Sequence, residues 1–171
     1  MSRPKLYLFV GVPGAGKTTV AKLIHDTTGA VHLWADQARQ AMFDKVSHSK
    51  AESDELYAYL NQQTDELLAA GQSVVFDTNF NYRKDRHYVA QIAARHDADS
   101  LIIWMQTPVA VARERALHDH HRDRNGYNIT MTAEEFNHLT DHLEPPADNE
   151  NFIIIDGTNL DTEAAKQQLG I

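Results

Sequence analysis

A glycine-rich segment near the start of the chain constrains the fold more than any other feature. Residues 11–18 read GVPGAGKT and follow directly on the apolar run LYLFV at residues 6–10. The spacing G-x-x-x-x-G-K-[ST], placed between a strand and a helix, is that of a phosphate-binding loop. Glycines let the backbone approach an anion, and the start of the next helix supplies N–H groups with partial positive charge. The segment therefore predicts a nucleotide site on a strand–loop–helix unit.

The same motif predicts a task for each of its polar residues. We expect Lys17 to reach the β- and γ-phosphates and the Thr18 hydroxyl to bind Mg²⁺. The predicted nucleotide-binding residues are Gly11, Val12, Pro13, Gly14, Ala15, Gly16, Lys17, Thr18 and Thr19.

Short apolar runs alternate with longer amphipathic ones along the whole chain, which is typical of an α/β layered fold. Strands are expected at residues 5–10, 31–34, 73–77, 100–105 and 152–155. Helices are expected at residues 17–28, 36–45, 52–70, 83–96, 108–118, 132–143 and 162–169. With 171 residues and no repeat or linker, the chain is expected to form a single domain over residues 1–171.

Composition narrows the function classes. Sixteen Lys and Arg against twenty-four Asp and Glu give a formal charge of −8, which argues against broad, non-specific nucleic-acid binding. The chain has no Cys, which excludes disulfides and thiolate-ligated metal sites. No apolar stretch approaches the roughly 20 residues that span a bilayer, and the N-terminus does not read as a signal peptide. We therefore expect a soluble, cytoplasmic protein.

Asp36 and Arg39 follow the second expected strand. Sites in parallel α/β sheets gather at the carboxyl ends of strands, and a carboxylate there can accept the proton of an attacking hydroxyl. Arg39, one helical turn later, could hold an anionic part of an acceptor. The alternative is that Asp36 caps its helix and Arg39 is a solvated surface charge.

Asp77 ends the third expected strand and is followed by Thr78 and Asn79. An Asp at the end of an apolar strand fits the role of holding Mg²⁺ or a Mg²⁺-bound water, or of orienting the acceptor. The alternative is a helix cap or an Asx-turn. Asn79 is expected to line the acceptor pocket.

The irregular, polar segment 118–131 is a candidate lid. Arginines brought in by a lid would stabilise the negative charge of a phosphoryl-transfer transition state, and we expect this of some of Arg113, Arg115, Arg122 and Arg124. The alternative is ordinary charged helix surface. The histidines at 118, 120, 121, 138 and 142 lack an obvious third ligand and are expected to be solvated rather than to form a transition-metal site.

Four segments together resemble a known family. GVPGAGKTT (11–19), ADQARQAMF (35–43), VVFDTNFNYRKDR (74–86) and WMQTPVAVARERAL (104–117) look like the P-loop kinases of the polynucleotide-kinase and zeta-toxin-like group, which includes many AAA-type ATP-binding proteins. The resemblance runs from Lys5 to about Ile155. It departs from the pattern at Ala35, where polynucleotide kinases often carry a second acidic residue.

This resemblance implies a five-stranded parallel sheet in the order 2-3-1-4-5 and ATP as the phosphate donor with Mg²⁺. It also implies roles for individual residues: Asp36 as general base, Arg39 on the acceptor, and Asp77 beside the acceptor. Arg115 would pack on adenine. A lid arginine, Arg122 or Arg124, would touch the transferring phosphate.

The expected function is an ATP-dependent kinase that phosphorylates a hydroxyl. The acceptor is left open between a small metabolite or nucleoside and a nucleic-acid 5′-hydroxyl, which the acidic charge disfavours. Two alternatives stay open. One is a nucleotide-binding switch that hydrolyses slowly, and the other is a zeta-toxin-like kinase of an amino sugar.

Overall fold

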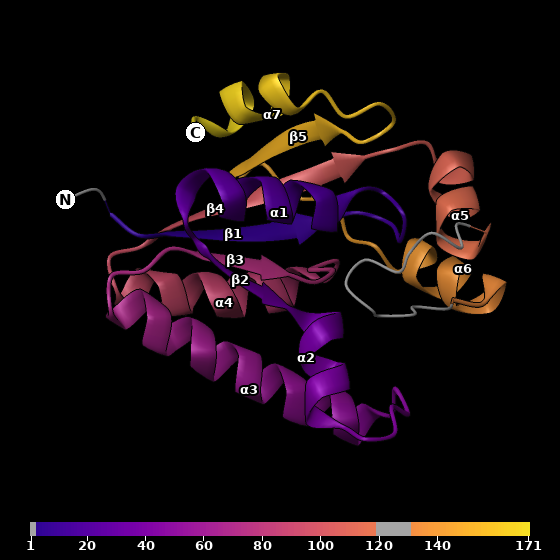
Figure 1. Cartoon of the computed structure of the whole chain (residues 1–171), viewed down its shortest axis with the longest axis horizontal. Helices are drawn as coiled ribbons and strands as arrows, with labels where there is room; N and C mark the ends of the chain where they lie inside the picture. The colour runs from indigo at the N-terminus through magenta and orange to yellow at the C-terminus, as the bar shows by residue number, and fades with distance from the viewer. Residues whose placement is uncertain (1–2, 119–130) are drawn as a thin grey trace.

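Five parallel strands form the centre of the protein. The computed structural model describes residues 3–118 and 131–171 (Figure 1). The strands are β1 (Lys5–Val10), β2 (Val31–Trp34), β3 (Val74–Asp77), β4 (Asp99–Gln106) and β5 (Phe152–Asp156). They pair in parallel in the order β2-β3-β1-β4-β5, which confirms the predicted sheet.

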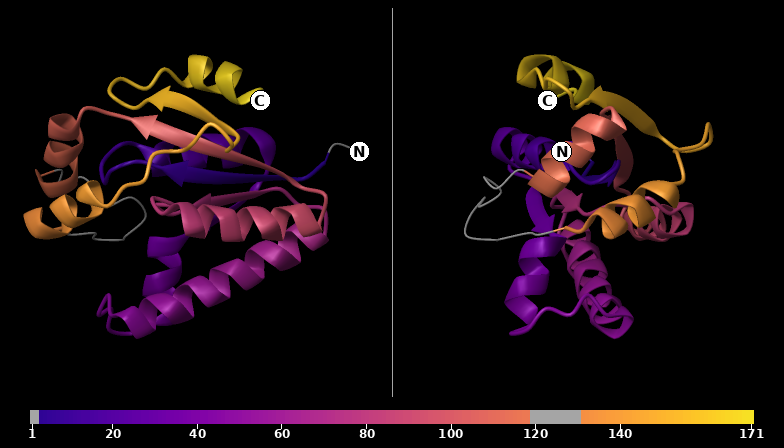
Figure 2. Two further views of the ribbon diagram at one scale, coloured as in Figure 1. Left: turned by 180° about the vertical axis from the view of Figure 1, so that it is seen from behind. Right: turned by 90° about the vertical axis from the view of Figure 1, so that its right-hand side faces the viewer.

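Helices cover both faces of the sheet and its carboxyl edge. They are α1 (Lys17–Thr28), α2 (Ala35–Met42), α3 (Lys50–Ala69), α4 (Arg83–Arg95), α5 (Val109–His118), α6 (Ala133–Asp141) and α7 (Thr162–Leu169). Helices α1 and α7 pack on one face and α3 and α4 on the other. Helices α5 and α6 lie beyond the arrowheads of the strands, as Figure 2 shows from two further sides. The carboxyl edge is therefore framed by α2, α5 and α6.

The central strand β1 explains the two-layered core. Its alternate residues face opposite helical layers, so Tyr7 and Phe9 join the core under α1 while Leu6, Leu8 and Val10 join the core over α3 and α4. A strand buried on both faces reads as a continuous apolar run, as this one does. This packing fixes the position of the loop that follows Val10.

Local signals set most helix ends. Thr132 and Glu135 form a capping box at the start of α6. Gly71, at φ 75°, ends the α3 region in the left-handed conformation. Two expectations need correction: α2 ends at Met42 rather than residue 45, and Pro108 precedes α5, where its carbonyl accepts from Ala112 N at 3.0 Å. The candidate lid at 118–131 falls outside the described residues except for its two end positions.

Within residues 3–118 and 131–171, the longest helix is α3, and neither it nor any other has the length and apolar character of a membrane span.

Candidate functional site

The phosphate-binding loop has the backbone geometry that its sequence predicts. Gly14 and Gly16 adopt φ values of 81° and 103°, a region that side-chain-bearing residues rarely enter. Gly16 is the N-cap of α1, so the first N–H groups of the helix face the loop. The Lys17 ammonium donates to the carbonyls of Gly11 and Val12, each at 2.9 Å, and so lies folded over the loop.

Asn81 holds the beginning of this loop, a role that the sequence reasoning missed. Its side-chain amide accepts from Gly11 N at 3.1 Å and donates to Gly11 O at 3.3 Å. The side chain is only 3% exposed. A buried amide that satisfies both backbone groups of Gly11 fixes the point where β1 passes into the loop.

Asp77 lies beside Thr18, as a shared magnesium site requires. The Thr18 hydroxyl donates to Asp77 Oδ1 at 3.3 Å, and His32 Nε2 lies 2.9 Å from Asp77 Oδ2. In the described part of the chain these contacts are to side chains, not to backbone N–H groups, so a capping or Asx-turn role is not seen. Hydroxyl and carboxylate oxygens are the ligands that Mg²⁺ prefers, so the two residues fit this ion.

Asp36 lies in the first turn of α2 and lines a cleft together with Lys17, Thr18 and Asp77. The N-cap of α2 is Trp34, so the alternative in which Asp36 caps the helix is wrong. The side chain is accessible from the cleft but is surrounded by protein atoms. This desolvation, together with the charge of Asp77, raises its pKa, while Arg39, Lys17 and His48 oppose the rise.

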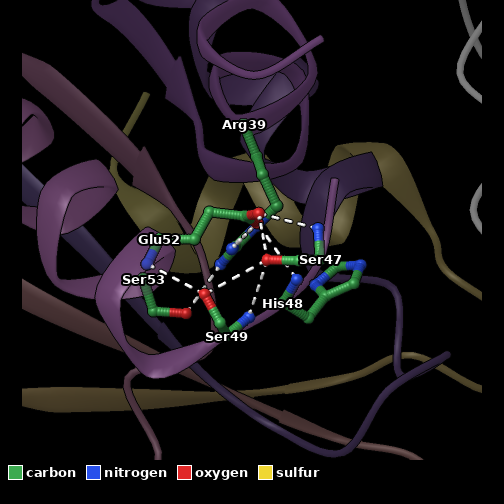
Figure 3. Close-up of polar contacts among 6 residues, drawn as sticks. All are labelled: Arg39, Ser47, His48, Ser49, Glu52 and Ser53. Atoms are coloured by element: carbon green, nitrogen blue, oxygen red, sulfur yellow. Dashed lines mark hydrogen bonds and ion pairs between the residues drawn. The ribbon is translucent and has the colours of Figure 1, made fainter. Parts of the chain in front are cut away.

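Arg39 is buried and paired, not a solvated surface charge. Its Nη1 donates to Glu52 Oε1 at 2.5 Å and its Nη2 to Ser53 Oγ at 3.3 Å (Figure 3). Arg39 and Glu52 are 8% and 7% exposed, and both Arg39 and Ser53 line the cleft. The guanidinium is therefore held in a set orientation at the α2–α3 end of the cleft.

Glu52 also accepts hydrogen bonds from the segment between α2 and α3 and so holds it in place. Its Oε2 accepts from Ser47 N at 2.7 Å and Ser47 Oγ at 2.8 Å, and its Oε1 accepts from His48 N at 3.2 Å (Figure 3). Burial acts to raise the pKa of Glu52, but these hydrogen bonds and the one from Arg39 outweigh it and lower the pKa to about 2. Glu52 is thus a carboxylate that organises Arg39 and the cleft-lining His48 together.

Arg115 joins the phosphate-binding loop to the segment after β5. Its Nη1 donates to Gly157 O at 2.8 Å and approaches Gly14 O at 3.5 Å, and its Nη2 donates to Thr158 O at 2.6 Å. Arg115 lines the cleft, whereas Arg113 is not among the described residues that line it, and contact of Arg115 with adenine stays a prediction. Arg122 and Arg124 lie outside the described residues.

One cleft of about 1720 Å³ brings these groups together at the carboxyl edge of the sheet. The predicted residues along its wall are Gly14, Gly16, Lys17, Thr18, Thr19, Asp36, Arg39, Asp77, Asn79 and Arg115. Of the other loop residues assigned to the nucleotide, Pro13 also lines it, whereas Gly11, Val12 and Ala15 do not. The cleft has room for a nucleotide and a second ligand, with Arg115 at one end and Arg39 at the other.

The cleft also contains residues for which no role was predicted from the sequence. Tyr57, from α3, lines it and shares a hydrogen bond of 2.8 Å with the Thr78 hydroxyl; burial raises the pKa of this tyrosine. His48 and Ser53 line the Arg39 end. Their signal in the sequence is weak, because a tyrosine or a serine in an acidic amphipathic helix reads as ordinary helix surface.

Histidines do not form a metal centre in the part of the chain described. Here no three His, Asp or Glu side chains come together to hold a metal ion. His138 and His142 stack with ring centroids 4.3 Å apart, and His142 Nδ1 lies 2.7 Å from His138 O. His120 and His121 lie outside the described residues.

Comparison with known proteins places the chain in a family. The model of AAA_33, an AAA domain, matches residues 6–146. No protein of curated function matches the sequence significantly.

Solved structures share the whole fold at low identity. A candidate kinase from Chloroflexus aurantiacus is 19% identical with a TM-score of 0.78, and the match covers 99% of this chain and 98% of the other. Kti12 from Chaetomium thermophilum, in complex with ADP-AlF3, is 17% identical with a TM-score of 0.76 over 96% and 95%. The Mycobacterium tuberculosis APS kinase CysC, in complex with AMPPNP and APS, is 19% identical with a TM-score of 0.70 over 99% and 98%. The chain therefore has the P-loop kinase fold.

Proposed function

The chain belongs to the AAA_33 family of AAA domains, and from this premise we propose that it is an ATP-dependent phosphotransferase acting on a hydroxyl group. The single observation that carries the proposal is the position of Asp36. The Asp36 carboxylate, whose pKa is raised, lines the same cleft as Lys17, Thr18 and Asp77. Lys17, Thr18 and Asp77 would serve a nucleotide switch equally well, so the position of Asp36, one helical turn from Arg39, is what favours a hydroxyl acceptor.

The donor half of the site is the phosphate-binding loop with its neighbours. The loop N–H groups and Lys17 would bind the phosphates of ATP, and Thr18 and Asp77 would hold Mg²⁺, which neutralises phosphate charge. Arg115 would bind the adenine end. Its guanidinium is already oriented by the carbonyls of Gly157 and Thr158, so ordering it costs little further entropy on binding.

The acceptor half is the end of the cleft between Asp36 and Arg39. Asp36 accepts the proton of the acceptor hydroxyl while that oxygen forms its bond to the γ-phosphorus and the bond to the β-phosphate oxygen breaks, releasing ADP. Lys17 must leave the carbonyls of Gly11 and Val12 to meet the phosphates. Arg122 and Arg124 would add positive charge at the transferring group.

The acceptor is a hydroxyl compound that fits against Arg39, Asn79 and Tyr57. A small metabolite or a nucleoside fits the acidic net charge of the chain better than a long polynucleotide, although a nucleic-acid 5′-hydroxyl remains in the same chemical class. Among solved structures of this fold, one is named an APS kinase and another a gluconokinase, so the fold serves unrelated hydroxyl acceptors.

The test is a screen for transfer from γ-labelled ATP to nucleosides, sugars, aminoglycosides, amino sugars and an oligonucleotide with a free 5′-hydroxyl. We expect one class to be labelled by the wild type and by Asp26→Asn, an exposed aspartate of α1 away from the cleft. Lys17→Ala and Asp36→Asn should both abolish labelling. Labelling that survives both changes would overturn the mechanism, and nucleotide binding with slow hydrolysis and no transfer would favour the switch.

A further inference from the structure

A histidine outside the phosphate-binding loop touches the carboxylate assigned to magnesium. We propose that His32 is a positioning residue, which holds the Asp77 carboxylate in the orientation that Mg²⁺·nucleotide binding requires. This inference rests on the nucleotide site of the proposed function, but not on the identity of the acceptor or on phosphoryl transfer.

The strand register explains how His32 reaches Asp77. In the parallel pair β2 and β3, His32 lies opposite Val75 and Trp34 lies opposite Asp77. Residues two apart in a strand share a face, so His32 and Trp34 project on the same side. Asp77 lies two residues beyond Val75, and the imidazole reaches along the sheet over this two-residue offset to bring Nε2 to 2.9 Å from Asp77 Oδ2.

The two oxygens of Asp77 have different partners. Oδ1 receives the Thr18 hydroxyl at 3.3 Å, which is long for an O–H···O bond, whereas the 2.9 Å contact of Oδ2 with His32 has ordinary geometry. Since a carboxylate oxygen only accepts, His32 Nε2 carries the hydrogen in this bond. His32 is therefore the firmer of the two contacts, and Oδ1 and the Thr18 hydroxyl are left to face a metal ion.

The histidine ring is itself held in place. It stacks on Trp34 at 6.2 Å between centroids with 12° between planes, and the His25 ring of α1 lies 6.3 Å away. The side chains of His32 and Asp77 are 13% and 3% exposed. A largely buried ring that stacks on Trp34, with its N–H aimed at a buried carboxylate, has little freedom to turn away.

Loss of this bond would leave a buried carboxylate oxygen without its donor. The carboxylate could then rotate away from the position that faces Thr18, which weakens its interaction with Mg²⁺. Residues that orient a metal-binding carboxylate typically contribute 10–100-fold to metal affinity. His32 is thus expected to affect the nucleotide only through the metal.

Substitutions at His32 can separate this bond from simple packing. Gln places its amide nitrogen close to the position of His Nε2, so His32→Gln keeps the donor. His32→Asn is also polar but about one bond shorter, and His32→Leu removes the donor while keeping an apolar side chain. The matched control is His25→Gln, because the bond of His25 goes to Ala30 O at 2.8 Å and not to Asp77.

The experiment measures the affinity of a fluorescent ATP analogue in EDTA and again in a Mg²⁺ titration, without any acceptor. We expect all variants to bind within about twofold of wild type in EDTA, which also shows that they are folded. The gain in affinity on adding Mg²⁺ should fall about tenfold or more in His32→Asn and His32→Leu, and should be kept in His32→Gln and His25→Gln.

Two results would overturn the inference. One is a wild-type Mg²⁺ gain in His32→Asn, and the other is an equal loss in His32→Gln and His32→Asn, which would mean that the ring only packs. Either result leaves the proposed kinase activity standing. Conversely, a failed acceptor screen leaves this measurement unaffected, because it requires nucleotide and Mg²⁺ alone.

Discussion

Gly157 allows the segment after β5 to pack directly against the phosphate-binding loop. A Cβ at this position would lie 2.0 Å from Ala15 O and 2.4 Å from Thr107 Oγ1. The Thr107 hydroxyl itself donates to Ala15 O at 2.9 Å, and the Gly157 carbonyl accepts from Arg115 at 2.8 Å. The change Gly157→Ala therefore forces apart two segments that both border the proposed nucleotide site.

The size of the effect follows from these distances. Real Cβ atoms essentially never approach another heavy atom closer than 3.0 Å, so the Ala15 carbonyl and residue 157 must separate by about 1 Å. Overpacking of this kind costs about 1–3 kcal/mol of unfolding free energy. A shift of about 1 Å in the loop and in Arg115 should also weaken ATP binding by about tenfold, or about 1.4 kcal/mol.

Urea unfolding and titration with a fluorescent ATP analogue measure the two effects separately. The control is Gly29→Ala: its Cβ would meet nothing within 4 Å, but φ of 73° makes the change cost about 1 kcal/mol of stability. Both variants should be less stable, and only Gly157→Ala should lose nucleotide affinity. Wild-type affinity in a folded Gly157→Ala protein would refute the claim that this segment supports the nucleotide site.

Three further predictions concern charged side chains. The raised pKa of Asp36 means that its ionised form opposes folding as pH rises through that pKa, so Asp36→Asn should be at least as stable as wild type at neutral pH, measured by thermal unfolding, although inactive. The pKa of Glu52 is lowered from 4.5 to about 2, so its carboxylate stabilises the fold above pH 4.5 and loses this contribution as the pH falls toward 2. Glu52→Gln should therefore lower the melting temperature at neutral pH, and lower it by less at acidic pH. An unchanged melting temperature at pH 7 would contradict the role of the ion pair with Arg39. Arg86 is 1% exposed and donates to the Glu150 carboxylate at 2.7 and 2.9 Å. Arg86→Leu should lower the free energy of unfolding in urea by about 3–5 kcal/mol, because it leaves that carboxylate without its buried partner. A loss below about 1 kcal/mol would contradict a stabilising role for this ion pair.

The residues of the proposed donor half can be picked out from the sequence because they are local, and their binding of ATP and Mg²⁺ stays a prediction. Lys17 and Thr18 lie in one continuous motif, and Asp77 ends an apolar strand whose boundary is easy to read. Strand positions follow from the same alternation of apolar and amphipathic runs. The order of the strands came from the family resemblance, since spacing alone does not say which strands pair.

The supporting contacts could not be predicted, because they join residues far apart in the chain. Glu52 reads as one more acid on a charged helix, and only the fold brings it to Arg39. Asn81 and His32 each bond a group on another strand or loop, 70 and 45 residues away. Polar residues inside or just after apolar strands are the signal that could have drawn attention to both.

The arrangement also explains why Arg39 was ambiguous from sequence. An Arg one turn after Asp36 fits either a surface helix or an acceptor site, and the local pattern is the same for both. The structure shows it buried against Glu52, a partner thirteen residues on, with Ser53 beside it. Arg39 is buried because α2 packs against α3, and this contact between two helices cannot be predicted from the residues next to Arg39 in the sequence.

The central claim is that Asp36 receives a proton during phosphoryl transfer, and one measurement tests it most directly. Transfer from γ-labelled ATP to the acceptor found in the screen is followed for wild type and Asp36→Asn at saturating ATP, alongside their affinities for the nucleotide. The account predicts that Asp36→Asn binds nucleotide within about twofold of wild type but transfers phosphate at least about 100-fold more slowly. Transfer at the wild-type rate by Asp36→Asn would contradict it.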